Sequence, residues 1–184
     1  MDQVAKLCST NEGKLRELRA ALPGWEIELL GACDYPPEVG ETYYENARAK
    51  AEFGRSVAPR AWVIGEDSGL EVEGLGGRPG VHSARFGGDD PVERLLAELE
   101  GVAERRARYV CELVALSPDG EEQRCTGVLE GRIGYEPRGS EGFGYDPIFV
   151  PDGEEQTVAE LGNDWKRGHS HRARAARALL AAVG

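Results

Sequence analysis

The sequence has no CxxC pair, no long apolar run and few positive charges for its number of acids, and each absence excludes a class of protein. Four widely spaced cysteines indicate neither a zinc site nor a disulfide framework, so we expect reduced thiols: Cys8, Cys33, Cys111 and Cys125. No uncharged apolar run approaches the roughly 18 residues of a membrane span, and the N-terminus shows no targeting segment. We therefore expect a cytoplasmic protein with no membrane partner.

The charge balance excludes a second class. Lys and Arg number 22 against 33 Asp and Glu, a formal net charge of −11. Affinity for a nucleic-acid backbone comes largely from clustered Lys and Arg, so we expect no nucleic-acid partner. A small anionic ligand remains compatible with this composition.

The remaining pattern predicts a mixed fold. With 184 residues and 40% hydrophobic residues, the chain can bury a sizeable core as one folding unit, 1–184. Alternating apolar residues predict strands at 25–29 and 70–72, and short apolar segments bounded by turn residues predict further strands at 4–8, 62–64, 107–116, 123–133 and 145–150. Helical spacing predicts helices near 14–22, 42–57, 91–99 and 170–183, with loops at 31–41 and 74–88. Crossover and hairpin connections together indicate an α/β or α+β fold around a mixed sheet.

The acidic segment Gly65–Gly69 is a candidate metal site. Glu66 and Asp67 are predicted to follow the end of an apolar strand, where α/β folds tend to place ligands. Magnesium takes oxygen ligands, usually one or two carboxylates with substrate phosphates and water. An isolated Glu-Asp pair is more readily explained as two solvated turn residues, so the surrounding sequence must decide between the two explanations.

Glu45 has two readings. It stands three residues after Thr42, which is the spacing of a capping box, so a local structural role is sufficient. It is alternatively a further magnesium ligand that projects from the start of the helix. Spacing alone does not choose between them.

A loop before the first helix is a candidate anion site. Backbone amides, hydroxyls and one ammonium group stand together at a helix N-terminus, where unpaired N–H groups attract phosphate. The residues are Ser9, Thr10, Asn11, Glu12, Gly13 and Lys14. Walker spacing is absent, and an ordinary capped turn explains the segment as well.

The C-terminal segment is basic within an acidic chain. Its cations are Lys166, Arg167, Arg172, Arg174 and Arg177. Ser170 is the expected N-cap of the last helix, so His171 and Arg172 fall in a first turn that disfavours positive charge. Residues placed against local preference are often functional. A solvated basic face is the alternative explanation, and it is more acceptable for Arg174 and Arg177 than for Lys166, His171 and Arg172.

Aromatic residues among glycines form another candidate. The segment Gly142–Pro147 contains Phe143, Gly144, Tyr145 and Asp146 ahead of a predicted strand. Aromatic faces suit stacking against a base, whose edge a carboxylate can read. A tight turn with core aromatics would look the same.

Taken together, these segments resemble the inosine/xanthosine triphosphate pyrophosphatase family over nearly the whole chain. Six motifs occur in the family's order, which is far more specific than any one of them. They are Ser9–Lys14, Glu45-Asn46-Ala47 with Lys50-Ala51, Glu66–Leu70, Gly76–Gly80 with Ser83-Ala84-Arg85, Gly142–Pro147, and Ser170-His171-Arg172.

The resemblance implies a reaction and a set of roles. Water would attack the α-phosphorus of a deaminated purine nucleoside triphosphate with Mg²⁺, releasing monophosphate and pyrophosphate and keeping such bases out of DNA and RNA. Asp67 would be a metal ligand and the general base, with Glu45 and Glu66 completing the metal environment. Ser9 to Lys14 and Ser68 would hold the triphosphate; Phe143, Gly144, Tyr145, Asp146, Lys166, His171 and Arg172 would hold the base.

The resemblance also implies a homodimer with a long mixed sheet, flanking helices and two lobes around a nucleotide-binding cleft. Two departures from the family pattern stand out: Glu66 replaces a common aspartate, and Ala173 follows Arg172 where glycine is common. Two other hypotheses stay open: a septum-inhibitor type of pyrophosphatase, and a nucleotide-binding module without turnover.

Overall fold

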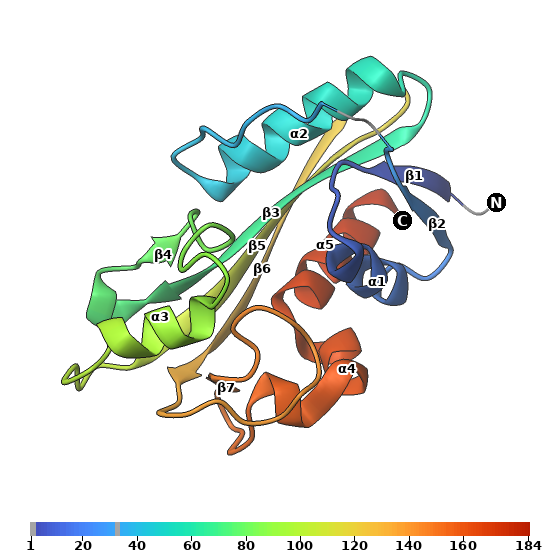
Figure 1. Cartoon of the computed structure of the whole chain (residues 1–184). Coiled ribbons are helices and arrows are strands. Elements are labelled where there is room, and N and C mark those ends of the chain that lie inside the picture. The colour runs from blue at the N-terminus through green and yellow to red at the C-terminus, as the bar shows by residue number, and fades with distance from the viewer. Residues whose placement is uncertain (1–2, 32–33) are drawn as a thin grey trace. The chain divides into compact units, whose positions relative to one another are not determined.

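The computed structural model describes residues 3–31 and 34–184, so the expectations for Cys33 and for residues 32–33 of the loop at 31–41 lie outside it (Figure 1). The strands form a mixed sheet in the order β2-β1-β3-β5-β6-β7, with β4 paired to β3. The strands are β1 (Gln3–Leu7), β2 (Trp25–Leu29), β3 (Trp62–Val72), β4 (Pro79–Gly80), β5 (Arg106–Leu116), β6 (Glu122–Ile133) and β7 (Phe149–Pro151). The helices are α1 (Glu12–Ala21), α2 (Tyr43–Val57), α3 (Pro91–Glu98), α4 (Val158–His169) and α5 (His171–Val183), with the 3₁₀ turn η1 (Glu73–Leu75). The predicted mixed α/β fold is confirmed.

The chain divides into two compact units. Unit 1 comprises Met1–Asp67, Cys111–Gly127 and His171–Gly184, and unit 2 comprises Ser68–Val110 and Val128–Ser170. Three of the boundaries fall inside strands β3, β5 and β6, and the fourth falls between α4 and α5. That the whole chain is one domain with a nucleotide cleft stays a prediction.

Unit 1 has helices on both faces of its part of the sheet. β1 pairs in parallel with β2 and with β3, where its register joins Ala5 to Trp62 and Leu7 to Ile64. On one face Leu7, Ile64 and Cys111 pack with apolar residues of α1 and α5. On the other face Cys8, Val63 and Val114 pack with Ala47 and Ala51 of α2. Alternation along each strand therefore supplies two cores.

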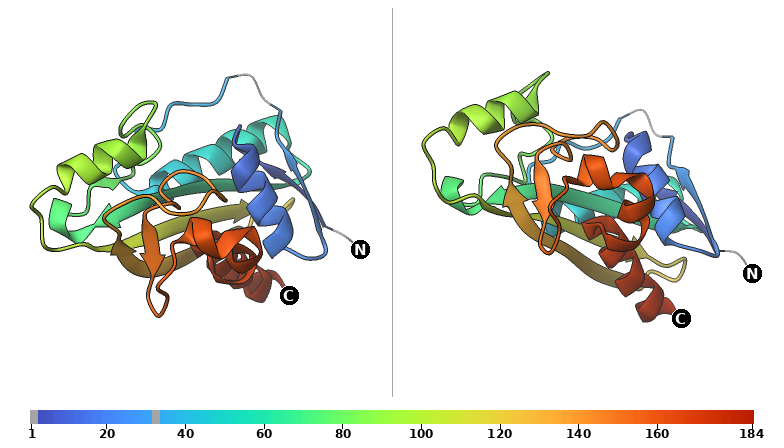
Figure 2. Two further views of the ribbon diagram at one scale, coloured as in Figure 1. Left: turned by 60° about the horizontal axis from the view of Figure 1, so that its bottom comes forward. Right: turned by 90° about the horizontal axis from the view of Figure 1, so that it is seen from below.

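Helices α1 and α5 form the first of these layers. They lie side by side in both views of Figure 2, and Leu15, Leu18, Ala176 and Leu179 belong to their shared core. α5 also crosses β6 very closely, because a Cβ at Gly127 would come within 2.0 Å of the His171 carbonyl oxygen. This approach places the start of α5 directly on the sheet.

Unit 2 has its own core. Leu70 and Val72 of β3, and Leu95 and Leu99 at the α3 end, are fully buried in it. Phe149 of β7 joins the same cluster. β4 and β7 add to the sheet by antiparallel pairing with β3 and β6, respectively.

The structure corrects the prediction of two strands and adds one helix. β3 does not end at Glu66; it continues as one strand to Val72, so the two predicted strands at 62–64 and 70–72 are one. The strand predicted from Tyr145 begins only at Phe149, because Asp146 closes a turn by accepting from the Phe143 N–H. Helix α4 was not predicted from the sequence, although Thr157 and Glu160 form a capping box at its start.

Membrane crossing can be addressed for the helices of residues 3–31 and 34–184. None of them combines the length and apolar character that a membrane span requires.

Candidate active site

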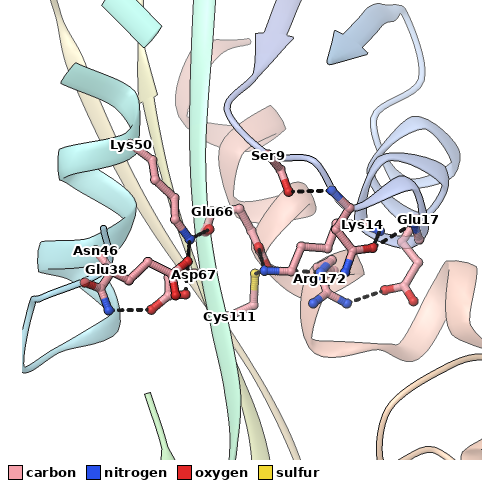
Figure 3. Close-up of polar contacts among 12 residues, drawn as sticks. Ser9, Lys14, Glu17, Glu38, Asn46, Lys50, Glu66, Asp67, Cys111 and Arg172 are labelled. Atoms are coloured by element: carbon pink, nitrogen blue, oxygen red, sulfur yellow. Dashed lines mark hydrogen bonds and ion pairs between the residues drawn. The ribbon is translucent and has the colours of Figure 1, made fainter. Parts of the chain in front are cut away.

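Asp67 lies in a buried polar cluster on the α2 face of unit 1. The residue is 4% exposed, and its carboxylate accepts from Asn46 Nδ2 at 3.0 Å and from Lys50 Nζ at 3.3 Å. Lys50 also donates to the Glu66 carbonyl oxygen at 2.9 Å and forms an ion pair with Glu38. Figure 3 shows these side chains on one side of β3. Asp67 is thus oriented by two residues of α2.

Glu66 points away from Asp67 and enters a different cluster. Its carboxylate is fully buried and contacts Lys14 Nζ at 2.5 Å and Arg172 Nε at 2.9 Å. The Cys111 thiol lies 3.6 Å from the same carboxylate. Arg172 in turn donates through Nη1 to Glu17 at 2.8 Å. Figure 3 shows this second cluster on the opposite side of the strand.

The two carboxylates have opposite pKa shifts. Burial raises the pKa of Asp67 above its ordinary 3.8, and Lys50 and Asn46 offset this only in part. Burial would also raise the pKa of Glu66, but Lys14, Arg172 and Lys50 hold it well below its ordinary 4.5. A carboxylate of raised pKa is the better proton acceptor, so Asp67 is the stronger candidate for a general base.

The loop of the predicted anion site is a capped helix start. The Asn11 side chain accepts from the N–H groups of Gly13 at 2.8 Å and Lys14 at 3.1 Å, and Ser9 Oγ accepts from the Asn11 N–H at 3.1 Å. Thr10 and Glu12 are exposed. Asn11 thereby fixes the turn from which Lys14 reaches Glu66.

Glu45 caps the start of α2, as its spacing from Thr42 predicted. Its Oε2 accepts from the N–H groups of Glu41 at 2.8 Å and Thr42 at 3.0 Å, and Thr42 Oγ1 accepts from the Glu45 N–H. The predicted capping box is confirmed. A role as metal ligand stays a prediction.

A second group of predicted residues gathers in unit 2. Asp146 accepts from Lys166 Nζ at 2.7 Å, from the Phe143 N–H at 2.9 Å and from the Tyr109 hydroxyl at 3.2 Å. Lys166 also lies 4.5 Å from the centre of the Phe143 ring. The Tyr145 hydroxyl donates to the Ser83 carbonyl oxygen at 3.1 Å, and burial raises the pKa of Tyr145 to about 12. Phe143, Asp146 and Lys166 therefore form one cluster.

The remaining predicted residues divide between the units. His171 and Arg172 are buried at the start of α5 in unit 1, whereas the half-buried Ser68 belongs to unit 2. Arg167 is exposed and pairs with Asp164 at 3.3 Å, as expected for a solvated basic face.

The donors suit magnesium better than a metal held by protein alone. Within residues 3–31 and 34–184, no three His, Cys, Asp or Glu side chains gather as a cation site. Mg²⁺ commonly binds through one or two carboxylates together with substrate phosphates. The Asp67 carboxylate, desolvated and fixed by α2, fits such a site.

A surface hollow of about 550 Å³ in unit 2 contains none of the predicted site residues. It is lined in part by Arg105, Arg106, Arg132 and Arg138. Their guanidinium groups donate to backbone carbonyls or to Asp152. We therefore assign no part of the site to this hollow.

Several polar residues of these clusters were missed as site residues. Asn46 and Lys50 stand four residues apart on the buried face of α2, beside Ala47 and Ala51. Buried polar residues within an apolar helical stripe are the signal that would have found them. Glu17, Glu38 and Tyr109 carry no comparable pattern, because only the tertiary fold brings each of them to its own cluster.

The same fold occurs in solved α/β proteins. The Ham1 protein of Staphylococcus aureus matches with a TM-score of 0.85 and 35% identity, covering 98% of each chain. The two proteins are therefore similar in sequence as well as in fold, over nearly their whole lengths.

The chain belongs to the Ham1 family, whose model matches residues 6–182. A relative in Deinococcus radiodurans named dITP/XTP pyrophosphatase is 45% identical, over 97% of this chain and 92% of its own. A relative of the same name in Symbiobacterium thermophilum is 48% identical, over 92% of this chain and 89% of its own.

Proposed function

We propose that this protein hydrolyses the deaminated purine nucleoside triphosphates ITP, dITP and XTP to the monophosphate and pyrophosphate. The observation that carries the proposal is the near full-length similarity, at 45% and 48% identity, to relatives named dITP/XTP pyrophosphatase. Removing these nucleotides from the pool would keep deaminated bases out of DNA and RNA.

Asp67 is proposed as the general base and as a metal ligand. Its carboxylate is buried, oriented by Asn46 and Lys50, and raised in pKa, which favours proton uptake from an attacking water. The Lys50 ammonium group lies between the carboxylates of Asp67 and Glu38, where it fixes both. This arrangement supports a pre-oriented base.

We propose Mg²⁺ as the cofactor, held by Asp67 and by Glu45, which lies on the same helix as Asn46 and Lys50. Bound Mg²⁺ would offset charge on the phosphates and favour loss of a proton from water. Glu45 would have to leave its cap or use its second oxygen to take part. For that reason its role needs a test of its own.

The substrate-binding residues are proposed in two sets. In unit 1, Ser9 to Lys14 would bind the triphosphate, with Lys14 as the fixed positive charge; Ser68 of unit 2 would assist. Phe143, Gly144, Tyr145, Asp146, Lys166, His171 and Arg172 are proposed for the base. Donors directed at the oxo group on purine C6 would meet another donor in adenine, and unpaired buried polar groups give strong discrimination.

We also propose that the protein acts as a cytoplasmic homodimer without a nucleic-acid partner. The family resemblance supports the dimer. The net charge of −11 supports the absence of nucleic-acid binding, because a phosphate backbone would be repelled.

The function is tested by product analysis with inosine triphosphate and Mg²⁺. We expect inosine monophosphate and pyrophosphate in equal amounts, and no turnover in excess EDTA until Mg²⁺ is restored. Release of orthophosphate with inosine diphosphate would instead identify a phosphohydrolase.

A substrate panel separates the other two hypotheses. Inosine, xanthosine, uridine and thymidine triphosphates are compared with ATP under the same conditions. Preference for uridine or thymidine triphosphate would favour the septum-inhibitor type. Tight nucleotide binding with no pyrophosphate release would favour a binding module.

A further inference from the structure

Glu66 and Asp67 are adjacent in sequence but lie on opposite faces of β3. Successive side chains of a strand alternate between its faces. Ile64 belongs to the α1 and α5 core, whereas Val63 belongs to the α2 core. Glu66 follows Ile64 by two residues and Asp67 follows Val63 by four, so each keeps the face of its apolar neighbour. The strand itself separates the two carboxylates.

Two positively charged side chains contact Glu66 on its side of β3. Lys14 Nζ at 2.5 Å and Arg172 Nε at 2.9 Å contact different oxygens of the carboxylate. The Lys14 side chain is 15% exposed and that of Arg172 is 3% exposed, so this is a largely desolvated network. A carboxylate that already meets two buried positive charges is poorly placed to bind a divalent cation as well.

Lys14 gains a defined position from this contact. A lysine side chain has much rotamer freedom, and ordering it at the moment of binding would weaken affinity. Asn11 fixes the backbone at Lys14, and Glu66 fixes the far end of its side chain. Arg172, itself held by Glu17, keeps the Glu66 carboxylate in place.

We propose that Glu66 is a positioning residue that orients Lys14 for the triphosphate through a buried bridge to Arg172, and that it does not bind magnesium. This inference rests on the proposed function. Figure 3 shows the bridge, with the Lys14 and Arg172 side chains both directed at Glu66 and with Asp67 directed toward α2. The bridge also accounts for a positive residue in the first turn of α5, because Glu66 and Glu17 neutralise it.

The test is a double-mutant cycle of Lys14→Met and Glu66→Gln, read as kcat/KM for inosine triphosphate at saturating Mg²⁺. If Glu66 acts through Lys14, E66Q lowers kcat/KM about tenfold alone and less than about threefold in the K14M background. If the two effects multiply fully, the proposal is overturned. A purely structural role would also give multiplication, because loss of folded protein does not depend on Lys14.

Direct metal binding gives a second readout. Mn²⁺ is titrated alone and followed by its paramagnetic resonance signal, without nucleotide. E66Q should bind Mn²⁺ within about threefold of wild type, whereas Asp67→Asn should weaken binding more than about tenfold. A tenfold loss in E66Q would make Glu66 a ligand and overturn the proposal.

Two further variants keep the result interpretable. Glu28→Gln removes an exposed carboxylate that pairs with Lys6 on the same unit, and should leave kcat/KM within about threefold of wild type. Should E66Q not fold, Glu66→Asp keeps the charge at a shorter reach and enters the same cycle. If wild type releases no pyrophosphate, the proposed function fails, while the Mn²⁺ comparison still decides whether Glu66 is a ligand.

Discussion

At the scale of single residues, the environment of Asp67 sets what the carboxylate can do. It is nearly excluded from water, yet Lys50 keeps a positive charge beside it. Desolvation and the ammonium group oppose each other, and desolvation dominates. The raised pKa makes the Asp67 carboxylate a stronger base, while Lys50 and Asn46 keep it oriented.

Substituting Asp67 by asparagine tests this balance. We expect D67N to lower kcat for pyrophosphate release by at least about 100-fold, because an amide cannot accept the proton. The urea midpoint should stay near that of wild type, since Lys50 keeps Glu38 and the Glu66 carbonyl oxygen. Asp164→Asn, at a side chain 91% exposed, is the control and should leave both quantities unchanged. Retained activity in D67N would remove its catalytic role.

At the scale of elements, the start of α2 combines a cap with a proposed ligand. Glutamine at position 45 can still accept from the N–H groups of Glu41 and Thr42 through its side-chain oxygen, so the cap survives in Glu45→Gln. We expect an unchanged urea midpoint, but the Mg²⁺ concentration for half-maximal activity should rise about tenfold or more.

The matched control for this variant lies on the same helix. Glu52→Gln changes an exposed acid that pairs with Arg48, and it should leave the Mg²⁺ requirement unaltered. If E45Q needs no more Mg²⁺ than wild type, Glu45 is not a metal ligand and its role is limited to capping α2.

The contact between α2 and β3 depends on a glycine. A Cβ at Gly65 would come within 1.9 Å of the Ala47 carbonyl oxygen and 2.7 Å of the Ala51 nitrogen. These are backbone atoms, so the helix itself would have to move. We expect Gly65→Ala to cost about 3 kcal/mol or more in free energy of unfolding. The rate of pyrophosphate release should also fall, because α2 carries Asn46 and Lys50, which orient Asp67.

Gly168 provides the comparison for this prediction. It lies in α4, and a Cβ at this position would meet no neighbouring atom within 4 Å, so alanine has room there. Gly168→Ala should be neutral or stabilise by up to about 1 kcal/mol, since alanine favours helix. Urea unfolding of both variants measures the contrast. Equal effects at the two positions would refute the close-approach argument.

At the scale of the whole molecule, charge bears on assembly. Light scattering should report twice the 20.0 kDa of one chain if the predicted homodimer forms. Because each copy carries a net charge of −11, the dimer fraction should rise as ionic strength increases from about 0.01 M to about 0.15 M. A constant mass of 20.0 kDa at both salt concentrations would contradict the dimer.

Most of the elements could be predicted because local patterns dominate them. Alternation identified β2, apolar segments bounded by turn residues identified β1, β5 and β6, and the caps Thr42 and Asp90 identified the starts of α2 and α3. β3 was divided in two because polar residues interrupt its apolar pattern, although both of its faces are buried there. α4 was missed despite its capping box, because Gly162 interrupts its helical pattern with a φ of +81°.

The sequence by itself determined the family, the mixed α/β class and the candidate residues, because ordered motifs and local periodicity are written along the chain. Only the tertiary structure decided what Glu66 and Asp67 each face. The pair reads as one acidic unit in sequence, but strand alternation sends Asp67 to α2 and Glu66 to Lys14 and Arg172. Arg172 stands 106 residues from Glu66, and no local pattern encodes a contact made by packing α5 on the sheet.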